Sequence, residues 1–359
     1  MRTRNLKLLL TTVPGIEELV VREIELKFGN VVQNYRKVGI TELGGRIIVE
    51  SSSKELLKKL TELHTIERAF LVIQEGEIGK KIENLIEVLD KLDLSWLDDY
   101  VTNFTTLAVK SVRAGEHEYT SLDIARELGK RIVEYFKTKG KSIVINLDNP
   151  DIVVEFDVIE NMYILGLELI RRSLRERKYR VFHHEASINP ILAYAMNMLL
   201  EYDINKEHVI ADPMCGSGTI VIEGCFHYKK SIFIGADIDY RNVRGAMKNV
   251  QKAGVDNRVV LLAADARTLS KYVRDVDGIV TNPPYGIRMT SLEKLEKLYR
   301  EFIREISQVL PSGARAVIIT PRRGLMNSAL ERVKDLYVEK QITVEQGGML
   351  STIFVLRKS

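Results

Sequence analysis

The fold is decided by residues 209–220, whose sequence is VIADPMCGSGTI. An apolar run ends in an acid at Asp212, a glycine-containing turn follows, and a helix is expected to begin near Thr219. Glycine has no side chain, so the backbone of the turn can approach a ligand closely. The stretch therefore predicts a strand–turn–helix unit that binds a nucleotide-like ligand at the carboxyl end of the strand.

A nicotinamide-dependent dehydrogenase is the competing interpretation of this unit, because dinucleotide-binding folds use a similar glycine turn. The third glycine of that pattern is missing, since position 221 is Val221. Asp212 also stands where a pyrophosphate would be repelled, whereas an acid suits a cationic ligand that carries an amino group. Both differences favour a ligand other than a dinucleotide.

Two further strands are expected to end in acids on the same edge. Residues 231–237, SIFIGAD, end at Asp237, which lies 19 residues after Gly218 and near the spacing of a ribose-binding carboxylate. A third strand over residues 259–264 is followed by Asp265 and Ala266, where a carboxylate can accept a hydrogen bond from an adenine amine.

The run Asn282-Pro283-Pro284-Tyr285 follows a fourth apolar strand at residues 278–280. Two prolines remove two backbone donors and fix two φ angles, which predicts a rigid, extended turn. The Asn282 side-chain oxygen and the Pro283 carbonyl can each accept an N–H of an exocyclic amine, and Tyr285 can stack on the base. Taken alone, the run leaves an ordinary Pro-Pro turn open as the alternative.

Strands and helices alternate from about residue 186, which predicts a doubly wound, mostly parallel α/β sheet. Its last two strands form an antiparallel pair around Gly347-Gly348. The seven expected strands cover residues 208–211, 231–236, 258–263, 277–281, 314–319, 339–345 and 352–357.

The N-terminal half has a different order of elements. Residues 7–73 are expected to follow the order β-α-β-β-α-β, which is typical of a ferredoxin-like unit, and its second helix begins at a Ser53 cap. Beyond it, a strand is expected over residues 106–113 and a helix over 121–137, with Ser121 as its N-cap.

The composition of the chain limits the class of protein, the number of domains and the compartment that are expected. An apolar content of 45% and a charged content of 28% are those of a globular protein, and 359 residues allow two or three domains. Two cysteines exclude a disulfide framework and indicate a reducing compartment, so a cytoplasmic location is expected. No signal peptide, membrane span or metal-ligand spacing is recognised.

Residues 171–180 carry six cations against one acid, which predicts either a phosphate-contacting segment or a solvated linker helix.

The catalytic motifs resemble those of a known enzyme family. The runs DPMCGSGT at residues 212–219, AD at 264–265 and TNPPYG at 281–286 resemble S-adenosylmethionine-dependent methyltransferases that modify exocyclic amino nitrogens. The runs TTVPGIEEL at residues 11–19 and PDIVVEF at 150–156 resemble RNA methyltransferases that carry a THUMP domain.

This resemblance implies a ferredoxin-like domain at residues 1–73 and a THUMP RNA-binding domain at 74–169. A basic linker at 170–185 and a class I, Rossmann-like methyltransferase domain at 186–359 follow. The implied fold is an α/β methyltransferase with a seven-stranded, mostly parallel sheet, preceded by two α+β domains.

The function implied by the resemblance is methyl transfer from S-adenosyl-L-methionine to guanosine N2 in tRNA, with position 6 of the acceptor stem favoured. Family members that act on position 10 usually carry Asp where this chain has Asn282, which disfavours that position. The alternatives are a 23S rRNA guanine-N2 methyltransferase and a DNA or protein amino-group methyltransferase. A non-catalytic RNA-binding protein is a further alternative, but the intact acids and the intact Asn282–Tyr285 run argue against it.

The resemblance also assigns site residues. The catalytic residues are Asn282, Pro283 and Tyr285, and no metal is expected. The cofactor-binding residues are Asp212, Pro213, Cys215, Gly216, Ser217, Gly218, Thr219, Asp237, Ile238, Asp265, Ala266 and Asn282. The expected RNA partner is tRNA, held at its acceptor stem and 3′ end. Candidate RNA contacts are Lys110, Arg113, His117, Lys141, Arg171, Arg172, Arg175, Arg177, Lys178 and Arg180, and Arg322 and Arg323 are further candidates near the site.

Overall fold

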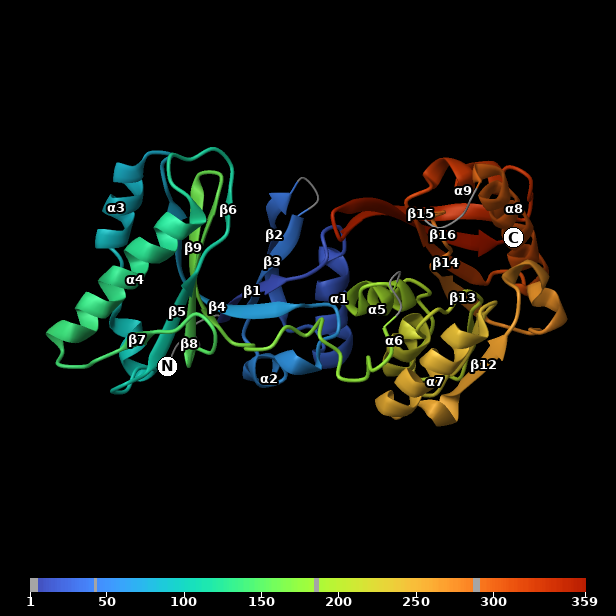
Figure 1. The fold of residues 1–359 in the computed structure, drawn as a ribbon, viewed down its shortest axis with the longest axis horizontal. Coiled ribbons are helices and arrows are strands. Elements are labelled where there is room, and N and C mark those ends of the chain that lie inside the picture. The colour runs from blue at the N-terminus through green and yellow to red at the C-terminus, as the bar shows by residue number, and fades with distance from the viewer. Residues whose placement is uncertain (1–5, 42–43, 184–186, 287–290) are drawn as a thin grey trace. The chain divides into compact units, whose positions relative to one another are not determined.

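The computed structural model describes residues 6–41, 44–183, 187–286 and 291–359, and the chain divides into two compact units (Figure 1). Unit 1 comprises Met1–Thr12 and Val20–Leu174, and unit 2 comprises Val13–Leu19 and Arg175–Ser359. No helix in the described part of the chain is both long and apolar enough to cross a membrane.

Unit 1 is built on one nine-stranded sheet in the order β2-β3-β1-β4-β9-β8-β5-β7, with β6 paired to β8. Its strands are β1 (Leu6–Thr11), β2 (Val32–Thr41), β3 (Gly44–Ser51), β4 (Arg68–Glu77), β5 (Thr106–Lys110), β6 (Arg113–Ala114), β7 (Val144–Ile145), β8 (Ile152–Ile159) and β9 (Met162–Glu168). Its helices are α2 (Lys54–Lys58), α3 (Ile82–Asp90) and α4 (Ser121–Thr138), and α1 (Glu17–Phe28) begins in unit 2 and continues in unit 1.

The first half of unit 1 has the element order β1-α1-β2-β3-α2-β4 and the strand order β2-β3-β1-β4. This arrangement agrees with the ferredoxin-like order expected from the sequence. The Ser53 hydroxyl accepts from Leu56 N at 3.2 Å, as expected of a cap, although the helix that it begins is short. Strand β4 pairs with both β1 and β9, so the expected domain boundary after residue 73 falls inside a strand. A division of unit 1 into two domains stays a prediction.

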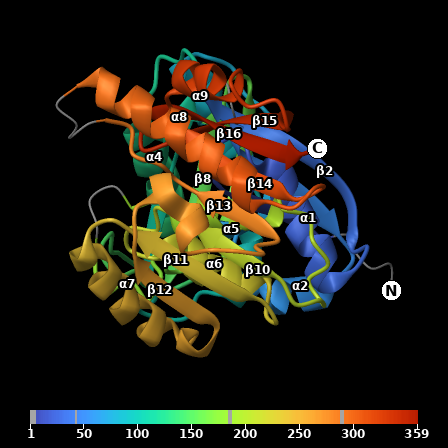
Figure 2. The same ribbon diagram turned by 90° about the vertical axis from the view of Figure 1, so that its right-hand side faces the viewer.

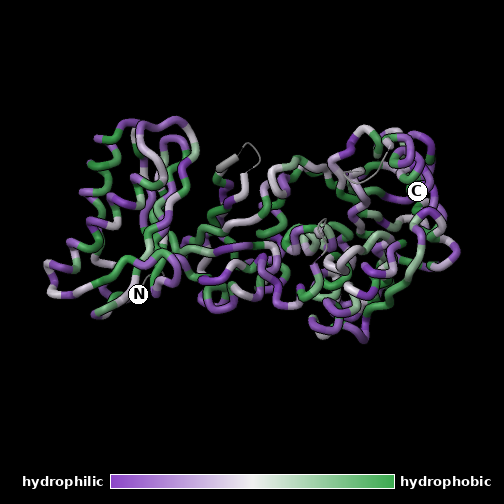
Figure 3. The backbone as a smooth tube through the Cα atoms, in the orientation of Figure 1, coloured by the Kyte–Doolittle hydropathy of each residue, from purple (hydrophilic) through white to green (hydrophobic). Residues whose placement is uncertain are grey.

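The second half of unit 1 packs α3 and α4 against β5, β8 and β9 around one apolar cluster. Helix α4 buries Ile124, Leu128, Ile132 and Phe136, which recur at helical spacing, so polar and apolar residues alternate along it (Figure 3). The strand expected over residues 106–113 is interrupted and forms the separate strands β5 and β6.

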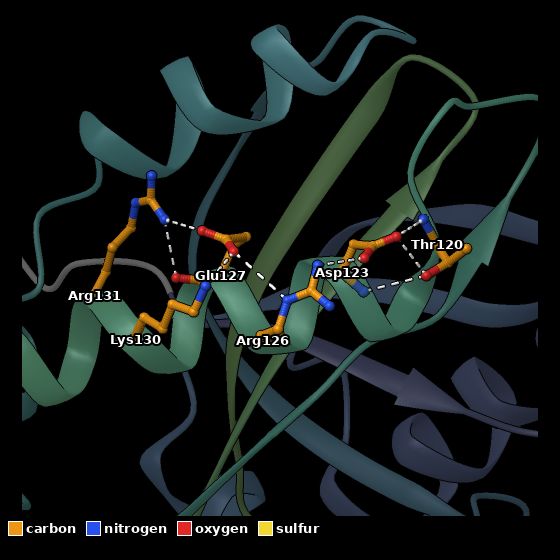
Figure 4. A network of polar contacts seen from close by, with 6 residues as sticks. All are labelled: Thr120, Asp123, Arg126, Glu127, Lys130 and Arg131. Carbon is orange, nitrogen blue, oxygen red and sulfur yellow. Dashed lines mark hydrogen bonds and ion pairs between the residues drawn. The ribbon is translucent and has the colours of Figure 1, made fainter.

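The N-cap of α4 is Thr120, and the prediction of Ser121 was wrong. The Thr120 hydroxyl accepts from Asp123 N at 3.2 Å, and Asp123 Oδ2 accepts in return from Thr120 N at 2.9 Å. This reciprocal pair is a capping box. It begins a row of ion pairs along the helix surface, which continues through Arg126, Glu127, Lys130 and Arg131 (Figure 4).

Unit 2 is a seven-stranded sheet in the order β12-β11-β10-β13-β14-β16-β15. The pairs from β12 to β14 are parallel, and β16 is antiparallel to both β14 and β15, which confirms the predicted doubly wound sheet. The strands are β10 (Val209–Asp212), β11 (Ile232–Asp237), β12 (Val259–Ala263), β13 (Gly278–Thr281), β14 (Arg315–Thr320), β15 (Leu336–Gln346) and β16 (Met349–Lys358). The helices are α5 (Pro190–Met198), α6 (Thr219–His227), α7 (Tyr240–Ala253), α8 (Leu292–Val309) and α9 (Arg323–Leu330).

Alternate residues of these strands pack on opposite faces of the sheet. Ile210, Val280 and Val317 belong to the cluster with α5, α6 and Val250 of α7, whereas their neighbours Ala211 and Ile279 belong to the cluster with α8 and α9. A period of two is what a strand with both faces covered requires. Figure 2 shows the strands between these two groups of helices. The carboxyl ends of β10 to β13 are left for a ligand.

Candidate active site

The four predicted polar strand ends lie on the same edge of the unit 2 sheet. Asp212 is the last residue of β10, Asp237 is the last residue of β11, and Asn282 directly follows β13. Asp265 follows β12 by two residues and caps a short 3₁₀ helix. Because β10 to β13 are parallel neighbours, their carboxyl ends meet at this edge.

Asp212 is the most buried of these acids, with 1% of its surface exposed. Its Oδ1 accepts from the Thr281 hydroxyl at 2.7 Å and from Met214 N at 3.2 Å. Its Oδ2 is buried and has no hydrogen-bond partner among the described residues. Burial raises the pKa of Asp212 to about 7, and the hydrogen bond from Thr281 opposes that rise. The Asp212 carboxyl group is therefore expected to titrate near neutral pH.

The turn after β10 is shaped by two glycines in the left-handed region. Gly216 has φ +52° and Gly218 has φ +78°, and Gly218 is the N-cap of α6. A Cβ at Gly218 would lie 3.2 Å from the Ala246 Cβ, so the turn packs tightly against α7. Cys215 is buried, and burial raises the pKa of its thiol. A thiol that stays protonated agrees with a packing role for Cys215 and not with a nucleophile.

The side chains at the start of α6 bond mainly to one another and to neighbouring chain segments. The Ser217 hydroxyl lies 3.1 Å from the Thr219 hydroxyl and 2.9 Å from the Ser187 hydroxyl. Asn249 on α7 donates to the Ser217 carbonyl at 2.9 Å. These contacts fix the turn and leave its glycine backbone as the surface suited to a ligand.

Asp237 holds the loop that begins α7. Its Oδ2 accepts from Gly216 N at 3.0 Å, and its Oδ1 accepts from Asp239 N at 2.8 Å and from Asn242 Nδ2 at 3.1 Å. A carboxylate has about four acceptor positions, so one remains for a hydroxyl donor. The next residue, Ile238, is 71% exposed and offers an apolar surface beside this acid.

Asp265 is engaged by Arg267 in this structure. Its Oδ1 accepts from Arg267 N at 2.9 Å, and its Oδ2 accepts from an Arg267 guanidinium nitrogen at 2.5 Å. The side-chain hydrogen bond from Arg267 lowers the pKa of Asp265, so this acid stays ionised. Ala266 beside it is buried. An adenine amine would share the Asp265 carboxylate with Arg267, a partner that the motif did not predict.

The Asn282–Tyr285 turn is closed by its own side chains. The Tyr285 hydroxyl donates to Asn282 Oδ1, and burial raises the pKa of Tyr285, so the phenol stays neutral. Pro283 is buried, whereas Pro284 is exposed. The amide oxygen that was expected to accept from a target amine therefore already has one donor, and it retains a second lone pair. Residues 287–290, which follow this turn, lie outside the described part of the chain.

Two residues brace the same turn from outside it. The Tyr299 hydroxyl on α8 lies 2.7 Å from the Thr320 hydroxyl and donates to the Pro284 carbonyl at 3.3 Å. Arg322 Nε donates to the Tyr285 carbonyl at 2.9 Å, which gives this candidate RNA contact a structural role. The sequence analysis did not identify Thr281, Tyr299 or Thr320. Only Thr281 carried a signal, its position directly before the Asn282–Tyr285 run.

Three of the four candidate RNA contacts between residues 110 and 141 have hydrogen-bond partners on the protein. Arg113 donates to the Gly115 carbonyl at 2.6 Å, Lys141 donates to the Val101 carbonyl at 2.7 Å, and His117 Nε2 lies 2.7 Å from the Glu160 carbonyl. Lys110 is half-buried at the end of β5. Neutral carbonyl partners do not cancel the positive charges of Arg113 and Lys141, so these two can still attract phosphate.

The basic segment at residues 171–180 includes a cation with a buried structural partner, and the RNA contacts expected there stay a prediction. Arg177 donates to Glu223 Oε1 at 2.8 Å in an ion pair whose side chains are 10% and 0% exposed, and Tyr179 donates to the same oxygen at 2.8 Å. Arg177 and Tyr179 therefore anchor the second half of the segment in unit 2, and no helix forms over these ten residues. The exposed cations are Arg171, Arg172, Arg175 and Lys178, while Arg180 is half-buried.

No group of three or more His, Cys, Asp or Glu side chains in the described ranges is arranged to hold a metal ion.

Comparisons with known proteins agree with this geometry. The family model of RMKL-like methyltransferase domains matches residues 177–352, and that of THUMP domains matches residues 80–168. A tRNA (guanine(6)-N2)-methyltransferase of Methanocaldococcus jannaschii is 29% identical over 96% of this chain and 98% of its own length. A tRNA (guanine(10)-N2)-dimethyltransferase of the same organism is 25% identical over 96% of both chains.

The solved structure of TrmN from Thermus thermophilus is also similar. It covers 99% of this chain and 100% of its own, with a TM-score of 0.80 and 26% sequence identity. The two domain matches, the full-length relatives and the sheet order all indicate a methyltransferase that carries a THUMP domain. The chain belongs to the methyltransferases that join a THUMP domain to an RMKL-like catalytic domain.

Proposed function

We propose that this methyltransferase transfers a methyl group from S-adenosyl-L-methionine to the exocyclic N2 of a guanosine in tRNA, at position 6 of the acceptor stem. The observation that carries the proposal is the Asn282–Tyr285 turn, which is placed beside the buried acid Asp212 through Thr281. The full-length similarity to a tRNA (guanine(6)-N2)-methyltransferase supports the target nucleotide.

The residues present fit the cofactor. The buried Asp212 Oδ2, which has no partner among the described residues, suits the ammonium of a methionine group. The backbone of Gly216 and Gly218 allows close approach, and Asp237 retains an acceptor position for a ribose hydroxyl. Ile238 offers an apolar face for the adenine ring, and Asp265 would share its carboxylate between Arg267 and the adenine amine.

When bound, S-adenosyl-L-methionine supplies an electrophilic methyl group, so the protein has to position the amine and needs no covalent intermediate. Asn282 Oδ1 and the Pro283 carbonyl accept the two N–H groups of guanine N2, which aims the nitrogen lone pair out of the base plane. Tyr285 carries both a ring for stacking and a neutral hydroxyl that orients the Asn282 amide. The guanosine has to leave its stack, at a cost of a few kcal/mol, and RNA binding away from the site can offset that cost.

Unit 1 and the exposed cations of residues 171–180 are the proposed binding surface for the acceptor stem and 3′ end. The division of the chain at residues 73, 169 and 185 is part of the same proposal. A tRNA-modifying activity supports a cytoplasmic location, which is also part of this proposal.

The test is methyl transfer from labelled S-adenosyl-L-methionine to unmodified tRNA and, separately, to ribosomal RNA, followed by nucleoside mass analysis and mapping. We expect N2-methylguanosine at position 6 of tRNA and no label in a tRNA with adenosine at that position. Label at position 10, or only in 23S rRNA, would contradict the proposed nucleotide. Methyladenosine, or label in protein or DNA, would contradict the guanine target.

The assigned roles are tested by two variants. Asn282→Ala should reduce kcat at least about a hundredfold while leaving the cofactor Kd within about threefold, because the amide positions the target amine. Asp237→Ala should instead weaken cofactor binding, as measured by isothermal titration calorimetry. Equal loss of cofactor binding in both variants would contradict the role given to Asn282.

A further inference from the structure

Asp212 is held asymmetrically at the carboxyl end of β10. One carboxyl oxygen accepts two hydrogen bonds, from the Thr281 hydroxyl and from Met214 N, while the other is buried with no partner in the described ranges. A buried, ionised carboxylate without a cation is costly, so the oxygen without a partner carries a proton or awaits a positively charged group.

Among the described residues, the charged and titratable groups that face Asp212 do not include a cation. Asp237 at the end of β11 repels its negative charge, and Cys215 in the glycine turn is a buried, neutral thiol. From β13 the only polar partner is the Thr281 hydroxyl. No cation of the described residues faces this carboxyl group, so the ammonium of a ligand would be the first positive charge beside it.

Thr281 connects this acid to the target-base turn. It is completely buried, it ends β13, and the next residue is Asn282. The other end of the turn is fixed by Tyr299 and Arg322, so Thr281 is the link on the cofactor side. Its hydroxyl donates to Asp212 whether Asp212 is neutral or ionised, and the hydrogen bond is stronger to the ionised form.

We propose that binding of the cofactor ammonium releases one proton from Asp212 to water, and that Thr281 is the positioning residue that couples this ionisation to the Asn282–Tyr285 turn. The proposal rests on the proposed cofactor. The Asp212 carboxyl loses its proton to water, and the resulting carboxylate pairs with the incoming ammonium, whose positive charge balances the negative charge left by that proton. Cofactor affinity and the positioning of the target base therefore both depend on the ionisation of the Asp212 carboxyl group.

The test is isothermal titration calorimetry with S-adenosylhomocysteine, repeated in buffers of different ionisation enthalpy so that the slope gives the number of protons released. At pH 6 the ligand amine is already protonated, and we expect release of about 0.9 proton in the wild type and about none in Asp212→Asn. Binding by the wild type without proton release would overturn the inference while leaving the proposed function standing. Absence of any S-adenosylhomocysteine binding would overturn the proposed function itself.

Thr281→Val and Thr281→Ser form the matched pair for the coupling. Thr281→Val removes the donor, so Asp212 should hold its proton to higher pH, and proton release at pH 7 should rise from about one half towards one. The pH profile of kcat/KM for S-adenosyl-L-methionine should shift in the same direction, with the KM for tRNA unchanged, and Thr281→Ser should restore both. Equal behaviour of the two variants would overturn the role of Thr281.

A second measurement needs no ligand. Carbon-13 NMR of labelled aspartate carboxyl groups should show one resonance that titrates near pH 7, that is absent in Asp212→Asn, and that moves to higher pH in Thr281→Val. A wild-type protein in which no aspartate titrates above pH 5 would overturn the inference.

Discussion

At the scale of single residues, three acids follow parallel strands yet meet different surroundings. Asp212 is buried with no cation beside it among the described residues, Asp265 is paired with Arg267, and Asp237 is held by backbone and amide donors. The pKa is accordingly raised at Asp212 by burial and lowered at Asp265 by its hydrogen bond from Arg267. In the proposed site, similar positions on strands would therefore serve a cationic group, an amine and a hydroxyl.

The raised pKa of Asp212 predicts a stability cost in the ligand-free protein. Its folded pKa of about 7 lies above the ordinary value of 3.8, so the folded state binds more protons than the unfolded state between these values. The free energy of unfolding therefore falls as pH rises from about 4 to 7. Asp212→Asn removes the titration and should stabilise the protein by roughly 2 to 4 kcal/mol at pH 8, with little change at pH 4.

Urea unfolding of the wild type and Asp212→Asn at both pH values measures this difference directly. The variant should gain stability at pH 8 and lose cofactor affinity at the same time. Lower stability of Asp212→Asn at pH 8 would contradict the burial of a carboxyl group without a cation.

At the scale of elements, the sequence predicted the strands of unit 2 well. A strand covered on both faces needs alternate residues for two cores, and the apolar runs near Ile210, Ile279 and Val317 carry that pattern. The contact between Thr281 and Asp212 could not be predicted, because it depends on which strands become neighbours in the sheet. The Arg177–Glu223 pair was missed for the same reason, since 46 residues separate its partners along the chain.

Helix ends show the other limit of sequence analysis. Thr120 and Ser121 are adjacent hydroxyl residues, and either could cap a helix. The backbone decides, because Thr120 has the extended φ of −100° and ψ of 168° that a cap needs. Asp123 three residues later completes the box with Thr120.

This assignment predicts that Thr120→Ala destabilises the protein by about 1 kcal/mol, while Ser121→Ala changes its stability by less than about 0.5 kcal/mol. Thr120→Ala leaves the Asp123 backbone N–H at the helix start without its acceptor, whereas Ser121 only occupies the first helical position. Thermal or urea unfolding of the two variants provides the comparison. A larger loss for Ser121→Ala would contradict the observed cap.

At the scale of the whole molecule, positive charge is concentrated locally. The net charge is only +4, so general attraction to RNA is weak, and binding has to come from clusters such as residues 171–180. Within that segment, Arg177 is committed to Glu223, and the exposed cations are the ones that can meet phosphate. The buried pair thus fixes the segment, and its exposed cations are the proposed contacts for RNA.

The corresponding prediction compares two triple variants with the same change in charge. Replacement of Arg172, Arg175 and Lys178 by serine should weaken tRNA binding and lower the slope of log K against log salt by roughly 2 to 3. Cofactor affinity should stay unchanged, because these residues lie outside the strand ends that form the site. The control replaces Lys206, Lys229 and Lys230, which are exposed in the loops before β10 and β11, at the amino edge of the sheet. Filter binding at several salt concentrations separates the two. Equal losses in both triples would mean that tRNA responds to overall charge and that the 171–180 segment is not a binding surface.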